Sequence, residues 1–169
     1  DAIFSDFRLY SYDGVQEAKV STEVIKDQSY IRPFEGNLAD WRTEGNVTID
    51  GEAMLMQGGA MAGLEGRVFT QSAIHVTMNL DGAADSWGGV MFGKETVYGD
   101  TANYGGYQVT LSKDGTVQLL GKTGVIETAS LGAAVSGDVP VKIIRSADSV
   151  KVSVNGNQVL TAQVSGYEE

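Results

Sequence analysis

Residues 85–107 bring aromatic rings and hydroxyl-binding side chains close together in the sequence. An aromatic ring can stack on the flat face of a sugar ring, while carboxylate, amide and cationic groups bind the sugar hydroxyls. Trp87 opens an apolar run, and a Gly-rich segment that suits a loop follows this run. The residues that we expect to contact a sugar are Asp85, Trp87, Lys94, Glu95, Tyr98, Asp100, Asn103 and Tyr104. The same pattern also allows Trp87 and Tyr107 to fill a core and the other tyrosines to lie on a loop surface.

The sequence lacks the common motifs for nucleophilic catalysis, nucleotide binding and thiolate or histidine metal sites. The chain has no cysteine, which excludes disulfides, thiolate metal sites and cysteine nucleophiles. Its one histidine, His75, stands in a strand-like run (AIHVTMNL) on the face opposite Ile74 and Val76, and we interpret it as structural. The sequence contains no G-x-S-x-G motif, P-loop, dinucleotide-binding fingerprint or histidine cluster.

The charge balance limits the partners. Twelve Lys and Arg against 22 Asp and Glu give a net charge of −10 over 169 residues. Nucleic acid and anionic lipid both require a basic face, so they are not expected partners. No apolar run approaches the roughly 20 residues of a membrane span. The acidity suits a secreted or cell-surface protein and offers carboxylates for calcium. No signal peptide is visible, and we expect the numbering to start at a mature or trimmed end.

Apolar alternation with a period of two, interrupted by tight turns, recurs along the chain. Turn signals stand at Asp50-Gly51, Lys113-Asp114-Gly115 and Asn155-Gly156. The alternating segments are expected strands, namely 2–10, 17–26, 46–50, 52–58, 63–70, 73–80, 87–93, 104–112, 116–122, 139–146, 149–155 and 158–164. Alternating strands bury one face each, which predicts an all-β fold of two antiparallel sheets packed as a β-sandwich.

The chain has no break in composition, so we expect a single domain over residues 1–169. The segment 27–40 is the expected long loop, and 128–136 is expected to be a loop or a single turn.

Two segments carry a family resemblance. They are FEGNLADWRTEGNVTIDGEAMLMQG (34–58) and DSWGGVMFGKETVYGDTANYGGYQVTLSKDGTVQLLGKTG (85–124), followed by VKVSVNGNQVLTAQV near the end of the chain. Together they resemble the concanavalin A-like jelly roll of secreted carbohydrate-active proteins, especially laminin-G-like and family-66 (fructan-binding) carbohydrate-binding modules. The resemblance implies a non-catalytic extracellular module that binds a polysaccharide or glycan. Relatives often carry Arg where this chain has Gly93-Lys94, so fructan is not implied as the ligand.

The resemblance also makes the first strand unusual. Family members usually close with a strand after the "VNG" hairpin. In this chain the stretch that resembles this closing strand is AIFSDFRLY (2–10), which stands at the start of the sequence within the segment 1–14. Three interpretations stay open: the domain is circularly permuted; strand 2–10 is donated to a neighbouring subunit; or the chain is a fragment of a tandem array. Donation implies the alternative function, a structural subunit of a surface filament or adhesin.

The resemblance implies one further site, for calcium, and a packing role for Trp41. Jelly-roll modules commonly hold a structural Ca²⁺ between the start of the domain and the closing strand, which points to Asp6, Glu35 and Asp40. Trp41 matches a packing residue. The fold also hosts retaining glucanases, which need two carboxyl groups roughly 5 Å apart. The nearest candidates here, Asp50 and Glu52, flank a turn glycine, so no enzyme activity is expected.

Overall fold

The described part of the chain is mainly antiparallel β-structure. The computed structural model describes residues 2–11, 25–26, 30–31, 38–64, 67–69, 71–82, 84–93 and 106–164. At positions 5–11, 25–26, 31 and 67–68 only the backbone is described. No helix occurs in these ranges, and therefore none that is long and apolar enough to cross a bilayer.

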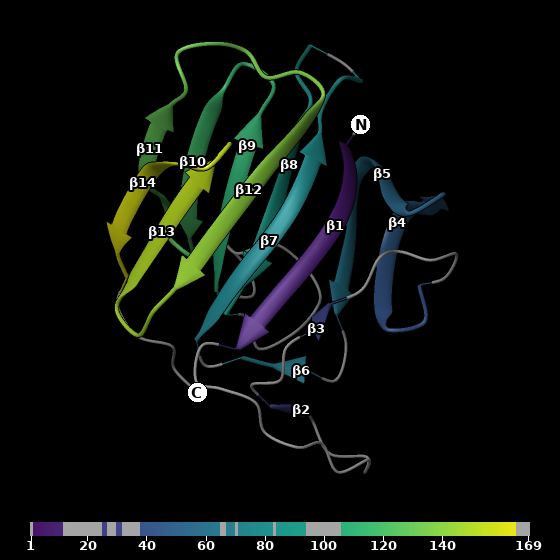
Figure 1. The fold of residues 1–169 in the computed structure, drawn as a ribbon, viewed down its shortest axis with the longest axis horizontal. Helices are drawn as coiled ribbons and strands as arrows, with labels where there is room; N and C mark the ends of the chain where they lie inside the picture. Colours follow the sequence, from purple (N-terminus) through teal and green to yellow (C-terminus); the bar gives the residue numbers. More distant parts are fainter. Residues whose placement is uncertain are drawn as a thin grey trace.

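The larger sheet has eight strands (Figure 1). Its order is β14 (Asn157–Gln163), β13 (Ser149–Val154), β12 (Asp138–Arg145), β7 (Ser72–Asn79), β1 (Ala2–Ser11), β5 (Ala53–Leu64) and β4 (Trp41–Asp50), with β3 (Tyr30–Ile31) also paired to β1. The smaller sheet has the order β11 (Gly124–Ser130), β10 (Thr116–Gly121), β9 (Tyr107–Ser112) and β8 (Trp87–Phe92). A short parallel pair, β2 (Ile25–Lys26) and β6 (Arg67–Val68), lies apart from both.

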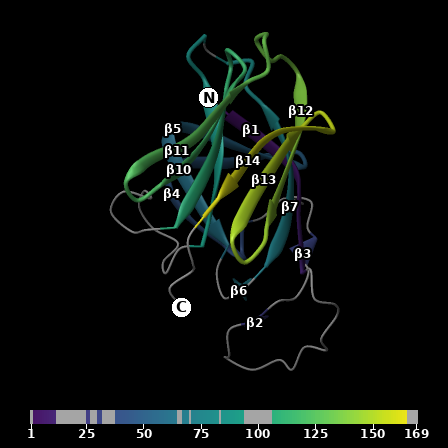
Figure 2. The same ribbon diagram turned by 90° about the vertical axis from the view of Figure 1, so that its left-hand side faces the viewer.

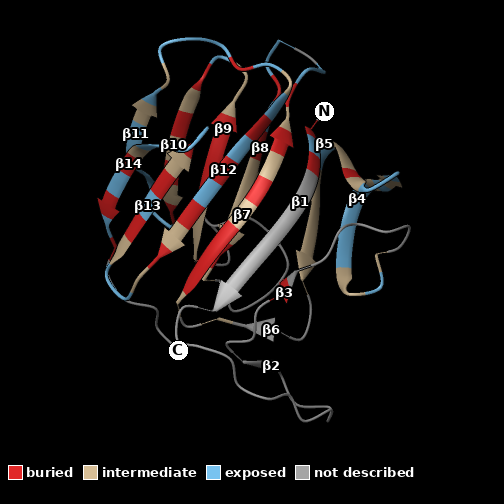
Figure 3. Cartoon of the chain, in the orientation of Figure 1, coloured by how far each residue is buried: buried red, intermediate tan, exposed pale blue. Residues whose placement is uncertain are grey.

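The two sheets pack face to face around one apolar core. Figure 2 shows the two layers from the edge where β11 and β14 lie side by side. Burial alternates along the strands, as the red and blue bands of β12 and β13 in Figure 3 show. Inward-facing residues include Val141 and Ile143 from the larger sheet and Val109, Val117 and Leu119 from the smaller one. The predicted β-sandwich is therefore confirmed, because period-two alternation gives each sheet one apolar face.

The first strand lies in the middle of the larger sheet. β1 pairs antiparallel with β7 on one side and with β5 on the other, within its own chain. Phe4 is 8% exposed, and its ring packs toward Gly88 of β8, where a Cβ atom would lie 3.2 Å from Phe4 Cζ. Gly88 thus lets β1 approach the smaller sheet closely. In this structure the strand closes its own sandwich; donation to a neighbouring chain stays a prediction.

The predicted hairpin turns are present. Gly51 follows β4 with a φ of 61°, and Asn155 and Gly156 have φ values of 50° and 79° between β13 and β14. Two consecutive residues with positive φ match the twist of a tight hairpin. Trp41 is half-buried, packs against the core and meets the Tyr30 ring edge-on at 6.2 Å, as a packing residue should.

Three sequence expectations need correction. Residues 128–130 belong to β11 and are not loop, although the loop expected after them is present at 131–137. Strand β5 continues through Gly58 and Gly59 to Leu64, where two strands were expected. Tyr30 and Ile31 form β3 inside the expected long loop 27–40. Most of the expected strand 17–26 lies outside the described residues, which hold only β2 from it.

Candidate functional site

Two of the eight sugar-contact residues expected from the sequence fall within the described part of the chain. Asp85 is exposed in the turn before β8, and Trp87 opens that strand with 52% of its surface exposed. Trp87 is therefore not a core residue. The other six, Lys94, Glu95, Tyr98, Asp100, Asn103 and Tyr104, lie outside the described residues.

Strand β8 separates two groups that are neighbours in the sequence. Trp87 begins the strand, while Gly93 and Gly106, the described residues that flank the segment 94–105, lie at its other end. Five residue steps from Trp87 to Phe92 span about 17 Å at the usual rise of a strand. Asp85 and Trp87 therefore belong to one end of the sandwich, and Gly93 and Gly106 to the other.

Trp87 lies on the outer face of the smaller sheet, which we call the Trp87 face. The face consists of outward positions from β8, β9, β10 and β11 arranged in three cross-strand rows. The upper row begins with Trp87, which pairs with Ser112, and ends with Thr116, which pairs with Ser130. Ser112 follows Leu111 and Thr116 precedes Val117, and Leu111 and Val117 are a register pair of β9 and β10. An exposed indole ring thus stands in line with three hydroxyl groups.

The middle row of the Trp87 face is also polar. Gly89 pairs with Thr110, Thr110 with Gln118, and Gln118 with Thr128. Gln118 Nε2 donates a hydrogen bond to Thr128 Oγ1 at 3.5 Å. Thr110 is only 9% exposed, so the groups of this row that face solvent are the Gln118 amide and the Thr128 hydroxyl. These groups donate and accept hydrogen bonds as sugar hydroxyls require.

The lower row is mainly apolar. Met91 pairs with Gln108, Gln108 with Leu120, and Leu120 with Val125. Val125 is 54% exposed. The Gln108 amide reaches toward the middle row, because its Nε2 lies 3.1 Å from where a Cβ atom on Gly89 would be. The three rows together form a neutral surface that is polar toward the Trp87 end and apolar toward the other.

The sequence already contained the signal for this face. In YQVTLS and TVQLLG the inward positions are Val, Leu and other apolar residues, and the positions between them are Gln108, Thr110, Ser112, Thr116 and Gln118. The alternation predicts these positions only as the solvent side of strands and does not mark them as a site. Only the register of four strands places them beside Trp87.

The turns beside the upper row are tied together by Asp81. Its carboxylate accepts a hydrogen bond from Lys113 Nζ at 2.8 Å and another from the Gly137 backbone N–H at 2.8 Å. The Lys113 contact, followed by the Gly137 bond, lowers the pKa of Asp81 below its usual range. The Lys113 backbone N–H donates to the Ser86 carbonyl next to Trp87. Asp81 thus connects the end of β7 to the turn that precedes Thr116.

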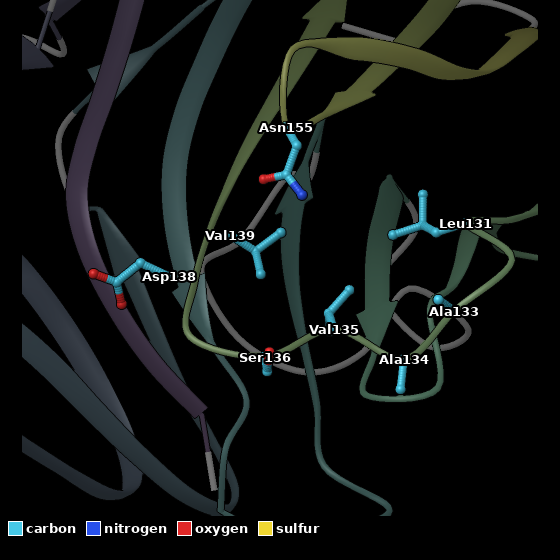
Figure 4. A pocket seen from close by; sticks show the side chains of 8 residues that line it. All are labelled: Leu131, Ala133, Ala134, Val135, Ser136, Asp138, Val139 and Asn155. Atoms are coloured by element: carbon cyan, nitrogen blue, oxygen red, sulfur yellow. The ribbon is translucent and has the colours of Figure 1, made fainter.

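A pocket of about 330 Å³ opens at the same end of the sandwich (Figure 4). Its wall is mainly small and apolar: Leu131, Ala133, Ala134, Val135 and Val139, with Ser136, Asp138 and Asn155. In Figure 4 the Asp138 side chain points away from the alanines, and its Oδ1 accepts a hydrogen bond from Asn79. Few polar groups converge in this pocket, so it suits a specific ligand less well than the Trp87 face.

The opposite end of the core holds a buried cation. Arg145 ends β12 on the inward face and is 1% exposed, and its guanidinium Cζ lies 5.9 Å from the centre of the Tyr107 ring. Tyr107 in turn contacts Phe92, with ring centres 6.1 Å apart. A cation over an aromatic face is attracted by the ring quadrupole, which offsets part of the cost of burial. Tyr107 is therefore a half-buried residue that packs against the core.

Asp40 is the one predicted calcium residue whose side chain lies within the described part of the chain. The half-buried Asp40 accepts a hydrogen bond from the Tyr30 hydroxyl at 3.3 Å. Asp6 lies in β1, but its side chain and all of Glu35 are outside what is described. No group of three or more potential metal ligands occurs among the described residues. Calcium binding stays a prediction.

Comparison with known proteins identifies a solved structure with a similar fold. No family model matches the sequence, and no curated protein matches it. Among solved structures the chain is similar to the carbohydrate-binding module CBM66 from Bacillus subtilis, with a TM-score of 0.61 and 18% sequence identity. The similarity covers 76% of this chain and 81% of the module. This chain therefore has the two-sheet β-sandwich fold of that carbohydrate-binding module.

Proposed function

We propose that this chain is a non-catalytic carbohydrate-binding module and that it recognises a polysaccharide or glycan through the Trp87 face. The observation that carries the proposal is Trp87 itself. A large aromatic side chain with half of its surface exposed stands at the end of a strand, in line with Ser112, Thr116 and Ser130. Aromatic residues beside a few polar groups are typical of small-molecule and sugar contacts.

The similarity to CBM66 supports the proposal at the level of the fold. The proposal adds secretion or display at the cell surface, where polysaccharides are encountered, and a structural calcium ion held near Asp40. Fold similarity does not determine function, whereas the chemistry of the Trp87 face supports glycan binding directly.

Replacing Trp87 with Ala is expected to weaken glycan binding by about 30-fold or more, because truncation of an aromatic anchor typically costs at least about 2 kcal/mol of binding free energy. The free energy of unfolding should change by less than about 1 kcal/mol, since the side chain is half exposed. Binding is measured by titration calorimetry with a glycan selected on an array, and stability is measured by urea denaturation.

Trp87→Phe is the matched variant, because it keeps an aromatic face and should retain part of the affinity. If Trp87→Ala binds the glycan as tightly as the unchanged protein, the Trp87 face is not the binding surface. If Trp87→Ala lowers stability by several kcal/mol, the residue is part of the core and its assignment to a site is wrong.

A further inference from the structure

The Trp87 face has no ionisable side chain in any of its three rows of four positions, although the chain as a whole carries a net charge of −10. Described charged residues border the face without occupying its rows: Asp85, Lys113 and Asp114 lie in turns, and Glu127 lies on β11 at a position that pairs with the inward-facing Leu119. Of these, Lys113 is already bonded to Asp81, and Asp114 accepts a hydrogen bond from the Thr116 backbone N–H. A charged sugar on this face would lose water without gaining a counter-charge, which is unfavourable. The face therefore fits a neutral ligand.

The polar part of the face is longer than one sugar ring. The upper and middle rows cross all four strands, from Trp87 on β8 to Ser130 and Thr128 on β11. Three strand spacings amount to about 14 Å. A single ring stacked on Trp87 cannot also reach Thr128. Hydrogen-bonding groups at both ends of the rows would therefore be used together only by a ligand of several sugar units.

The face ends at an edge strand on each side. β8 and β11 are the two edge strands of the smaller sheet, and in the described part of the chain no further strand of this sheet flanks either of them. At the β11 end Thr128 and Ser130 are both exposed. A glycan chain that lies across the strands could continue past either edge, whereas a closed pocket would admit only a chain end.

We infer that the Trp87 face binds an internal stretch of a neutral, linear glycan, laid across the four strands with one sugar stacked on Trp87 and others bonded to Gln118 and Thr128. This inference rests on the proposed function and specifies its ligand class. Affinity then depends on chain length, on the absence of charge and on residues at the β11 end.

The test uses neutral linear oligosaccharides of one to six units from several series (cello-, manno-, laminari- and inulo-), titrated into the protein. Affinity is expected to rise at least tenfold from one unit to several and then to level off. Oxidation of the primary hydroxyls of the best ligand to carboxylates should weaken its binding at least tenfold. Thr128→Ala should weaken binding of the longer oligosaccharides about threefold to tenfold, the usual effect of one hydrogen bond, and leave binding of the shortest ones unchanged.

Thr161→Ala is the matched control. Thr161 accepts a hydrogen bond from Gln158 at 3.0 Å, as Thr128 does from Gln118, but it lies on the outer face of the larger sheet. This control should bind every oligosaccharide as the unchanged protein does. Equal affinity for one unit and for six, or equal affinity for neutral and oxidised ligands, overturns the inference while the proposed function stands. The inference is also overturned, while the proposed function stands, if Thr128→Ala binds like the unchanged protein and Trp87→Ala no longer binds. Failure to bind any of these neutral oligosaccharides overturns the inference, and failure to bind any glycan on the array overturns the proposed function as well.

Discussion

Replacing Phe4 with Ala is expected to lower the free energy of unfolding by about 3–5 kcal/mol. Phe4 is 8% exposed, belongs to the core and lies in a strand that pairs on both sides. Its ring also fills the space over Gly88, so its removal leaves a cavity between the two sheets. Urea denaturation followed by tryptophan fluorescence measures the effect.

Ile3→Ala provides the control within the same strand. Ile3 is 37% exposed and lies on the opposite face of β1, so its truncation should cost less than about 1 kcal/mol. Equal effects of the two substitutions would show that β1 is not seated as described. The unfolding midpoint should also be independent of protein concentration, because β1 pairs within its own chain. A midpoint that rises with concentration would instead favour a strand shared between subunits, as in the filament alternative.

Gly115→Ala is expected to destabilise the fold by about 3 kcal/mol or more, since backbone strain and overpacking each cost roughly 1–3 kcal/mol. Gly115 has a φ of 86°, and an added Cβ atom would lie 2.1 Å from the Ala133 carbonyl oxygen, so backbone would have to move. The same turn binds the β11–β12 loop, because the Gly115 carbonyl accepts a hydrogen bond from the Leu131 N–H. Thermal and urea denaturation measure the loss.

Gly132→Ala is the control that separates the cost of backbone strain from the cost of steric overlap. Gly132 also has a positive φ, 78°, but nothing lies within 4 Å of its added Cβ atom. It should cost only the backbone strain, about 1 kcal/mol. Similar losses for the two variants would mean that the close approach of the turn to the β11–β12 loop is not present in solution.

Local alternation was enough to predict most of the sandwich. Strands such as 73–80 and 149–155 bury every second residue, and their apolar side chains recur with the same period in the sequence. The turns at Asp50-Gly51 and Asn155-Gly156 need residues that accept positive φ, and the sequence supplies them. Where pattern and burial coincide in this way, the element can be predicted without the structure.

Strand β11 shows where this reasoning fails. In GVIETAS every residue except Ala129 is exposed, so the strand has no apolar alternation to detect. It is specified by its pairing with β10, from Thr116 opposite Ser130 to Gly121 opposite Gly124. An edge strand of this kind is defined by its neighbour, and the sequence of the segment alone suggests a loop.

The candidate site could be predicted only in part for a related reason. Trp87 was found because an aromatic residue beside Gly and Asp is conspicuous in the sequence. Gln118 and Thr128 lie far along the chain and join Trp87 only through the register of the sheet. Sequence proximity groups Trp87 with the segment 94–104, which lies outside the described residues, and Gly93 before that segment lies at the other end of β8 from Trp87.

The most direct test of the central claim is an NMR titration of the ¹⁵N-labelled protein with the tightest-binding neutral oligosaccharide. If the Trp87 face is the binding surface, amide shifts should concentrate in residues 87–91, 108–112, 116–120 and 125–130, and the Trp87 indole N–H signal should shift as well. Amides on the outer face of the larger sheet, such as those of Lys142 and Thr161, should stay in place. Shifts confined to the larger sheet, or to residues around Gly93 and Gly106 at the far end of β8, would contradict the account and place the binding surface elsewhere.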